Sequence, residues 1–581
     1  MAITVSGIAP VAHLPLILGV LRKLEVAALI DDVLPPHPDN VISCGRGVEA
    51  LVLAILDGDH ALYKVGARLA ERGMLPLLQQ GVKRESLNDY RLGQILDRLF
   101  AANLNRLFGT LALKALEVYS IDTPWLHQDT TTLSLYGAYE ASEAGGEREA
   151  NENTDAPVVP RPAYGHSKDQ RPDLKQVMLS LGVSGEEGLP LRMGIRDGNT
   201  SDSTEIPVAI EEYVALGRAG TVGIVADSKA YSRRTLGLCV EKSLGLVTLV
   251  PRTCGVRQEV EAWGQRHAPL PLLVEKPGRT KRDAPRRWWG QSVERMVEVE
   301  YRDGRVEQAP LRFVVVYSSQ LAQQQAAAYA TAQVKEAERV ADHIRRVQAR
   351  SFACVADAEA AMAQEEGHGP GRRGRTPTRW RSHALHYRVE AFTHHPKRSR
   401  RGRPPKTEPA PQETRYRLVV EAEALPQTAL EQGWTVLATT VDAETCSDAQ
   451  ILRAYHEQNS TVEPGLRWIK NPAAITPMWL EKPERIAALA MLTVLGLLVY
   501  GLIQRQVRLY LQAHQQHVPG NKGPTDTPTA AVVLSLFTPV MMVQVQVDKA
   551  IVRQVYGWQD HHGRVCDALG IDHAWYDMHP T

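Results

Sequence analysis

Three acidic residues in separate parts of the chain have the side-chain type that binds divalent metal ions. Asp129 and Asp227 each lie at or beside an apolar run that indicates a strand, and Glu463 lies in a segment with helical periodicity. Carboxylate oxygens are the hard ligands that Mg²⁺ and Mn²⁺ prefer in proteins. The sequence therefore predicts a magnesium site, open also to manganese, made of Asp129, Asp227 and Glu463.

The segment from Tyr455 to Lys470 adds two cations beside Glu463. On a helix with about 100° per residue, Arg467 falls roughly 40° and Lys470 roughly 20° from Glu463. A carboxylate and two cations on one face suit a ligand that carries both a metal and phosphate groups. Pro464 lacks an amide hydrogen, so we expect a kink in this helix.

These residues also have simpler interpretations. An aspartate at the end of a strand caps a turn more often than it binds a metal, which applies to Asp129 and Asp227 taken singly. Glu457 is an alternative third carboxylate. The remaining nearby candidates favour turn, capping or pocket-lining roles: Asp122, Asp197, Asp202, His127 and His166.

Composition limits the class of protein. A chain of 581 residues is long enough for three or four domains. Its 67 Lys and Arg against 66 Asp and Glu exclude a uniformly basic surface, so any DNA contact must come from local patches. Six cysteines without a CxxC pair favour a reducing compartment. The N-terminus lacks the pattern of a secretion signal, and we expect a cytoplasmic protein.

One apolar segment has the length of a membrane span. Residues 486–503 include no charge over eighteen positions, which is the lower limit for a transmembrane helix. The segment contains Thr493, Gly496 and Gly501 and closely follows the charged segment around Glu463. We interpret it as a buried core helix and expect no membrane partner.

Changes in the pattern of apolar and polar residues along the chain predict an α/β protein with five parts. Residues 1–118 are mostly helical and compatible with DNA binding, and residues 119–252 alternate strands with helices. Residues 253–432 form an expected β-rich insertion around a helix from Gln320 to Arg350. Residues 433–512 resume the α/β pattern, and residues 513–581 form a C-terminal subdomain with strand-like runs at 532–537 and 540–547.

Two basic segments lie in the expected insertion. Arg401 and Arg403 belong to an Arg-Gly-Arg-Pro sequence that suits the minor groove of A·T-rich DNA, with a solvated basic linker as the simpler alternative. Residues 279–282, with Arg286 and Arg287, form the second basic patch. The neighbouring Trp288 and Trp289 are expected at strand core positions.

Several motifs stand together in an order that resembles the DDE transposases of bacterial insertion sequences. The resemblance covers roughly residues 120–510 and is closest to the branch with a β-rich insertion and the signature Y-x2-R-x3-E-x6-K. It implies a ribonuclease H-like core, interrupted by a large mainly-β insertion and preceded by a helical N-terminal domain. The motifs are Gln128–Thr131, Tyr164–Gln176, Gly198–Asp202, Val225–Asp227 and Tyr455–Lys470.

The resemblance assigns the catalytic carboxylates to Asp129, Asp227 and Glu463, with Asp129 bridging two metal ions. Lys470 matches the lysine of the signature, and Tyr455 its tyrosine. The chain departs from the signature at Gln458, which replaces the arginine and precedes Glu463 by four intervening residues rather than three. The resemblance then leaves Arg467, Lys470 and Tyr455 as the helix residues that contact DNA.

The same resemblance implies partners and a reaction. The partners are double-stranded DNA, as transposon ends and target, and a second copy of the chain in the synaptic complex at the bacterial nucleoid. The reaction is metal-dependent cleavage at terminal inverted repeats followed by strand transfer. The alternatives are a ribonuclease H-like nuclease without strand transfer and a catalytically inactive DNA-binding protein.

Overall fold

The computed structural model describes residues 3–137, 139, 157–185, 188–215, 222–278, 283–366, 380, 383–395, 412–425, 432–470, 480–547 and 550–577. Contacts divide the chain into two units. The first comprises residues 1–260, 292–314 and 436–581, and the second residues 261–291 and 315–435. Residues 118 and 512, the expected domain boundaries, both lie inside the first unit.

A large mixed sheet lies at the centre of the first unit. The strands of this sheet that belong wholly or partly to the first unit follow the order β4-β3-β2-β5-β6-β12-β9-β8. β2, β5 and β6 are parallel, whereas β3 and β4 continue the sheet antiparallel from β2. The α/β class is thereby confirmed. The bounds are β2 Trp125–Ser134, β3 Gln176–Ser184, β4 Pro190–Arg196, β5 Gly223–Ala226, β6 Gly245–Leu249, β8 Arg286–Glu300, β9 Val306–Ser318 and β12 Trp434–Thr439.

The central strands are apolar because both their faces are covered. Every residue of β3 is buried, as are all four of β5, which is the pattern of strands inside a helix-covered sheet. β5 and β6 also approach closely at their first residues. A Cβ on Gly223 would lie 2.3 Å from the Gly245 carbonyl oxygen, so only glycine fits there.

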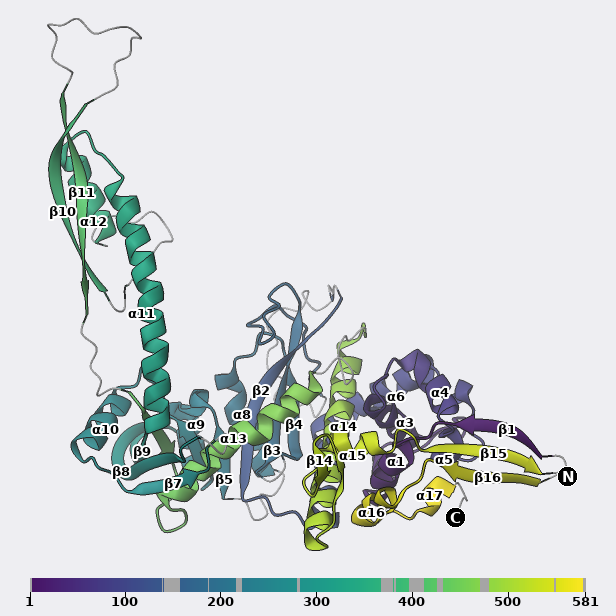
Figure 1. Ribbon diagram of the computed structural model, residues 1–581. Helices are drawn as coiled ribbons and strands as arrows, with labels where there is room; N and C mark the ends of the chain where they lie inside the picture. Colours follow the sequence, from purple (N-terminus) through teal and green to yellow (C-terminus); the bar gives the residue numbers. More distant parts are fainter. Residues whose placement is uncertain are drawn as a thin grey trace, which may run out of the picture. The chain divides into compact units, whose positions relative to one another are not determined.

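Helix α13 (Asp448–Ile469) crosses this sheet and contacts β2, β3, β5 and β6 (Figure 1). A capping box of Ser447 and Gln450 starts it. Arg312 of β9 donates to the Asp448 carboxylate at 2.5 Å and so ties its first turn to the sheet. The helix continues without a break through Pro464.

The N-terminal region is helical, as expected, and packs around one long helix, α14 (Pro483–Ala513). α14 contacts α3, α6 and α7 as well as β4 and α13. Arg485 at its start pairs with Asp97 of α6 at 2.7 Å. The N-terminal elements are α1 Leu14–Lys23, α2 Val26–Val33, α3 Cys44–Leu56, α4 Leu62–Glu71, α5 Leu75–Leu78, η1 Arg84–Leu87, α6 Asp89–Ala101 and α7 Leu104–Val118.

α14 contains the apolar segment of residues 486–503. Within the described part of the chain it is the one helix long and apolar enough to cross a membrane, with a mean hydropathy of 2.5. However, 89% of that apolar window is buried inside the protein. The prediction of a core helix is confirmed.

The C-terminal region pairs with the N-terminal strand. β1 (Ile3–Ala9), β15 (Met541–Val547) and β16 (Ala550–Tyr556) form a three-stranded sheet. The strand expected at 540–547 is confirmed, but the one expected at 532–537 is wrong. Thr529 caps a helix there, α15 (Ala530–Leu536), because a short apolar run fits a buried helix as well as a strand. The region also contains β13 Val518–Gly520, β14 Gly523–Thr525, α16 Asp560–Leu569 and α17 Ala574–Asp577.

The second unit combines helices and strands. Its hairpin, β10 (His383–His394) with β11 (Glu413–Ala424), lies along α11 (Ser319–Gln348) and α12 (Val355–Glu365) (Figure 1). Leu418 and Val420 of the hairpin pack on Val347 and Ala361 of the helices. β7 (Leu272–Lys276) pairs with the start of β8, and α10 spans Gly255–Arg266. The helix expected at 320–350 is confirmed as α11. The described residues of the expected insertion hold five strands, β7 to β11, beside three helices, α10 to α12.

A buried ion network joins β4 to helix α8 (Asp202–Ala215) in the first unit. Arg192 is 2% exposed and donates to Glu205, Glu212 and Ser180, and it also lies 3.3 Å from Gln128 of β2. Glu205 itself is 1% exposed. The network therefore fixes α8 to the sheet next to Asp129.

Replacing Arg192 by Met should destabilise the protein by up to about 3–5 kcal/mol, because the buried Glu205 carboxylate would keep only Arg196 as an ion partner. Chemical denaturation measures this loss. Arg171→Met is the matched control, since Arg171 pairs with Asp173 on the surface, where an ion pair contributes less than ~1 kcal/mol. Equal losses in the two variants would show that the network does not stabilise the sheet.

Candidate active site

Asp129 and Asp227 lie side by side in the sheet. In the parallel pair of β2 and β5, Gln128 is opposite Ala226, and each aspartate is the next residue. Burial raises the pKa of Asp129, and the negative charges of Asp227 and Asp202 raise it further, against the opposing charge of Lys168. Two of the three predicted carboxylates thus share one electrostatic environment.

Asp202 is a third carboxylate at this place, and sequence reasoning missed it. A capping role was expected, but Ser201 accepts from the Thr204 amide at the start of α8. Asp202 instead accepts the Thr130 hydroxyl at 2.5 Å and the Lys229 ammonium at 2.6 Å. Its burial acts to raise the pKa of Asp202, but these bonds and the Lys168 charge outweigh that effect and lower the pKa.

Two lysines compensate the three carboxylates. Lys168 donates to the carbonyl and hydroxyl oxygens of Thr130, both at 2.7 Å. Its ammonium also lies 3.9 Å from Asp129 Oδ1 and 3.6 Å from Asp202 Oδ2. The hydrogen bond from Lys229 to Asp202 raises the pKa of Lys229. The site therefore holds positive charge next to its acids.

Asp227 also has the capping role that the simpler interpretation predicts. Its Oδ1 accepts from the Lys229 amide at 3.0 Å and caps the short helix η3 (Ser228–Ala230). Thr248 of β6 donates to the Asp227 carbonyl oxygen at 2.6 Å. Capping and metal binding are compatible, since a carboxylate has two oxygens with several lone pairs.

α13 brings Tyr455 and Gln458 to these strands. Burial raises the pKa of the half-buried Tyr455, and the charge of Asp227 adds to the rise, so its phenol lies near that aspartate. Gln458 is buried and lies 3.4 Å from the Gln128 carbonyl oxygen. An arginine at position 458 would bring a charge into this buried contact.

Glu463 projects away from the strands that bear the aspartates. A Cβ on Gly465 would lie 4.0 Å from Leu181 of β3, which is opposite Asp129 in the sheet. At about 100° per residue, Glu463 points roughly 160° away from Gly465 around the helix, and it is exposed.

Within the described residues, no three Asp, Glu, His or Cys side chains lie close enough together to hold a metal ion. Neither Glu463 nor the alternative Glu457 therefore completes a set with the two aspartates in this structure. The role of Glu463 as the third ligand stays a prediction.

The predicted DNA-contacting residues have different positions. Lys470 is the C-cap of α13 and forms an ion pair with Asp169. Arg467 is exposed on the last turn. Arg401 and Arg403 lie outside the described residues, as do residues 279–282 of the second basic patch.

The histidine and tryptophan candidates differ in burial, from the fully buried His127 to the exposed His166. His127 is fully buried on β2, two residues before Asp129, and burial lowers the pKa of His127 to about 4, so its ring is neutral. His166 is exposed on the loop before Lys168. In the second unit, Trp289 lies 6.1 Å from the ring of Tyr317, which lies 5.1 Å from Trp434.

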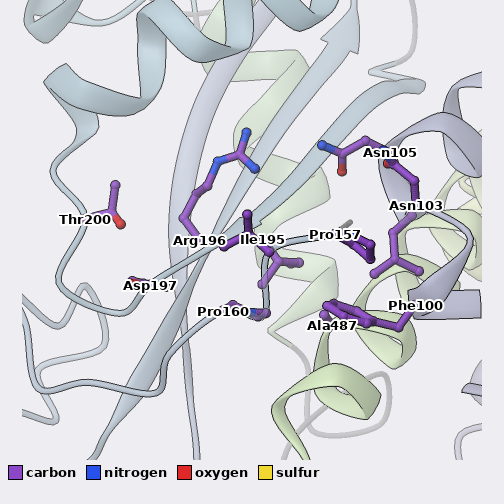
Figure 2. A pocket seen from close by; sticks show the side chains of 12 residues that line it. Phe100, Asn103, Asn105, Pro157, Pro160, Ile195, Arg196, Asp197, Thr200 and Ala487 are labelled. Carbon is purple, nitrogen blue, oxygen red and sulfur yellow. The ribbon is translucent and has the colours of Figure 1, made fainter. Parts of the chain in front are cut away.

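A cavity of about 510 Å³ lies elsewhere in the first unit (Figure 2). Its lining includes Arg196, whose guanidinium is held by Glu205 and Glu212. Asp129, Asp202 and Asp227 are not among its lining residues, so it is separate from the acid site. The other lining residues are Phe100, Asn103, Leu104, Asn105, Pro157, Val158, Pro160, Ile195, Asp197, Thr200 and Ala487.

The donor set at Asp129 fits a divalent cation in part. Hard carboxylate oxygens of Asp129 and Asp227 are neighbours, and Asp202 lies close by. The raised pKa of Asp129 reflects burial and unbalanced negative charge, which a divalent cation would relieve. The aspartates supply oxygen donors of the type that Mg²⁺ and Mn²⁺ prefer, but the described residues do not form a set of three ligands, so the metal stays a prediction.

Asp129→Asn should make the metal-free protein more stable at neutral pH. A carboxyl whose folded pKa is raised keeps its proton at pH values where the unfolded chain has lost it, so stability falls as the pH rises through that window. Above the folded pKa this cost is present in full, and asparagine avoids it. Thermal unfolding in EDTA should give a higher Tm for the variant, by a margin that narrows toward pH ~4.

Added Mn²⁺ should make the wild type more stable than Asp129→Asn. It should stabilise the wild type by about 2.7 kcal/mol at a hundredfold excess over its Kd, with little effect on Asp129→Asn. A variant that is less stable than the wild type in EDTA would contradict the account of Asp129.

Comparison with known proteins identifies a matching domain family and distant structural likenesses. Residues 6–113, which cover α1 to most of α7, match a domain of unknown function, DUF4277. No protein of curated function matches the chain. A piggyBac transposase, solved in a synaptic complex with hairpin DNA, is similar at 12% sequence identity and a TM-score of 0.24. The match covers 51% of this chain and 60% of the transposase chain.

Proposed function

We propose that this protein is a DDE-type transposase of an insertion sequence. It would bind the terminal inverted repeats of its element, cleave the DNA with Mg²⁺ or Mn²⁺, and join the freed ends to a target. The observation that carries the proposal is the β2–β5 register that makes Asp129 and Asp227 neighbours. Further support comes from α13, which crosses the same strands and carries Tyr455, Glu463, Arg467 and Lys470.

In the proposed site, Asp129, Asp227 and Glu463 would hold the divalent metal ions. Bound there, the metal would activate the attacking oxygen and stabilise the leaving oxygen of a phosphodiester. The cations of Lys470 and Arg467 hold DNA phosphates, with Tyr455 beside Asp227. Arg401 and Arg403 add salt-sensitive contacts to the DNA backbone or minor groove.

Each chemical step exchanges one phosphorus–oxygen bond for another. In cleavage, a water oxygen attacks the phosphorus, the P–O3′ bond breaks, and the 3′-oxygen leaves as a hydroxyl after taking a proton. In strand transfer, that 3′-hydroxyl attacks a target phosphodiester and a new 3′-hydroxyl leaves. The protein supplies position and charge for both steps.

The proposal requires Glu463 to turn toward Asp129 when metal and DNA bind. Pro464 follows Glu463 directly and removes one hydrogen bond from the helix, so α13 has reduced backbone support at this point.

Two DNA ends must be held together for transposition, and we propose that two copies of the chain do this. The setting would be the nucleoid of a bacterial cytoplasm.

A DNA assay tests the proposal. Purified full-length protein is incubated with labelled duplex DNA that carries the ends flanking its gene, in Mg²⁺, Mn²⁺ or EDTA. The proposal predicts end-specific binding in all three and end-specific nicks only with metal. Cleavage without end specificity would favour a ribonuclease H-like nuclease.

Two observations favour an inactive DNA-binding protein as the second candidate. Glu463 points away from the aspartates, and Gln458 replaces the signature arginine. End-specific binding without nicks in either metal would support this candidate and reject the transposase.

A further inference from the structure

The loop of residues 164–175 contacts both halves of the proposed site through adjacent side chains. Lys168 reaches the acids on β2 and α8, and Asp169 reaches Lys470 at the end of α13. We propose that this loop, here named the latch loop, fills the site with its own charges until metal and DNA replace them. The inference rests on the proposed function and describes how that site is regulated.

The first half of the latch concerns the metal. The Lys168 ammonium lies within 4 Å of both Asp129 and Asp202, at 3.9 and 3.6 Å. It is a monovalent cation held where a divalent cation would bind the same oxygens. Its bonds to the Thr130 carbonyl and hydroxyl oxygens keep it there. Metal must therefore displace the positive charge of Lys168 from these carboxylates.

The second half concerns the nucleic acid. Asp169 presents a carboxylate to Lys470, which the proposed function assigns to DNA phosphates. The ion pair is partly shielded from solvent, with side-chain exposures of 25% for Lys470 and 31% for Asp169. Asp169 thus occupies the anion position of this lysine, and a phosphate must displace it.

The backbone fixes the loop at its base. Ala163 and Gln176 exchange two backbone hydrogen bonds of 3.1 and 3.0 Å. The Lys168 amide donates to the Thr132 hydroxyl at 3.2 Å, and the amides of Asp169 and Arg171 donate to Ser167 Oγ. Because residues 168 and 169 share one peptide bond, displacement at either site loosens the other, which couples metal binding to DNA binding.

The metal half is tested by Mn²⁺ binding to the full-length protein without DNA, followed by the electron paramagnetic resonance of free Mn²⁺. Lys168→Met should bind Mn²⁺ roughly tenfold more tightly than the wild type, because a competing charge about 4 Å away is lost. Lys335→Met, which removes an exposed lysine of α11, should leave the affinity unchanged. Asp129→Asn should abolish the binding.

The DNA half is tested by duplex binding in EDTA over a range of salt. Asp169→Asn should bind more tightly than the wild type, with a salt slope steeper by about one, because one more lysine becomes available for a phosphate. Asp173→Asn is the matched control, since Asp173 in the same loop pairs only with Arg171 among the ion pairs of the described residues. In a Lys470→Met background, Asp169→Asn should have no effect.

The outcomes separate the latch from the proposed function. If the wild type binds Mn²⁺ through Asp129 but Lys168→Met binds no more tightly, Lys168 only supports Thr130 and the latch is wrong. The latch is equally wrong if Asp169→Asn binds DNA like Asp173→Asn. If the wild type shows no Mn²⁺ binding that depends on Asp129, both the latch and the transposase proposal are overturned.

Discussion

Asp227→Asn should reduce metal-dependent DNA cleavage by about 10³-fold or more, which corresponds to ~4 kcal/mol of transition-state stabilisation. Asparagine keeps the size of the side chain and an oxygen that can accept from the Lys229 amide, so the cap of η3 survives. It loses the negative charge, and with it most of the attraction between this side chain and a divalent cation. Single-turnover cleavage of a labelled transposon end measures the effect.

The control for this variant is Asp173→Asn, which removes an exposed charge from the latch loop and should cleave within a few-fold of the wild type. Circular dichroism and end-specific DNA binding should be unchanged in Asp227→Asn. Cleavage at the wild-type rate by Asp227→Asn would contradict the assignment of Asp227 as a metal ligand and leave it with its capping role alone.

Glu463→Gln should be as damaging as Asp227→Asn, with a loss of about 10³-fold in cleavage, whereas Glu457→Gln should change the rate only slightly. Glu463 and Glu457 are both exposed on α13, so neither substitution should disturb packing. The pair therefore tests which carboxylate turns into the site. A larger loss of cleavage in Glu457→Gln than in Glu463→Gln would assign the third ligand to Glu457. It would also mean that α13 rotates in the other sense.

Much of the fold follows from local patterns in the sequence. The apolar runs that precede Asp227 and surround Asp129 predict their strands, and the periodicity of residues 455–470 predicts a helix, because burial on one face or two fixes these patterns. Residues 532–537 show the limit of this reasoning, since six mostly apolar residues do not distinguish a strand from a short buried helix.

The residues that make up the site were harder to predict than the strands and the helix on which they lie. Asp202 and Lys168 approach Asp129 from a helix start and a loop, and such contacts arise from tertiary packing rather than from spacing along the chain. In the sequence, only their positions within the motifs at 198–202 and 164–176 indicated that Asp202 and Lys168 belong to the site. The rotation of α13 that turns Glu463 outward also depends on packing, here of Gly465 against Leu181 and Leu497.

The proposed function requires that Asp129 and Asp227 belong to a site that joins DNA strands. The most direct test supplies the full-length protein with a pre-cleaved transposon end that has a free 3′-hydroxyl, a supercoiled target plasmid and Mn²⁺. We expect covalent joining of the labelled end to the plasmid by the wild type and none by Asp129→Asn or Asp227→Asn. Wild-type protein that binds the end but joins nothing, or variants that join at the wild-type rate, would contradict the proposed function.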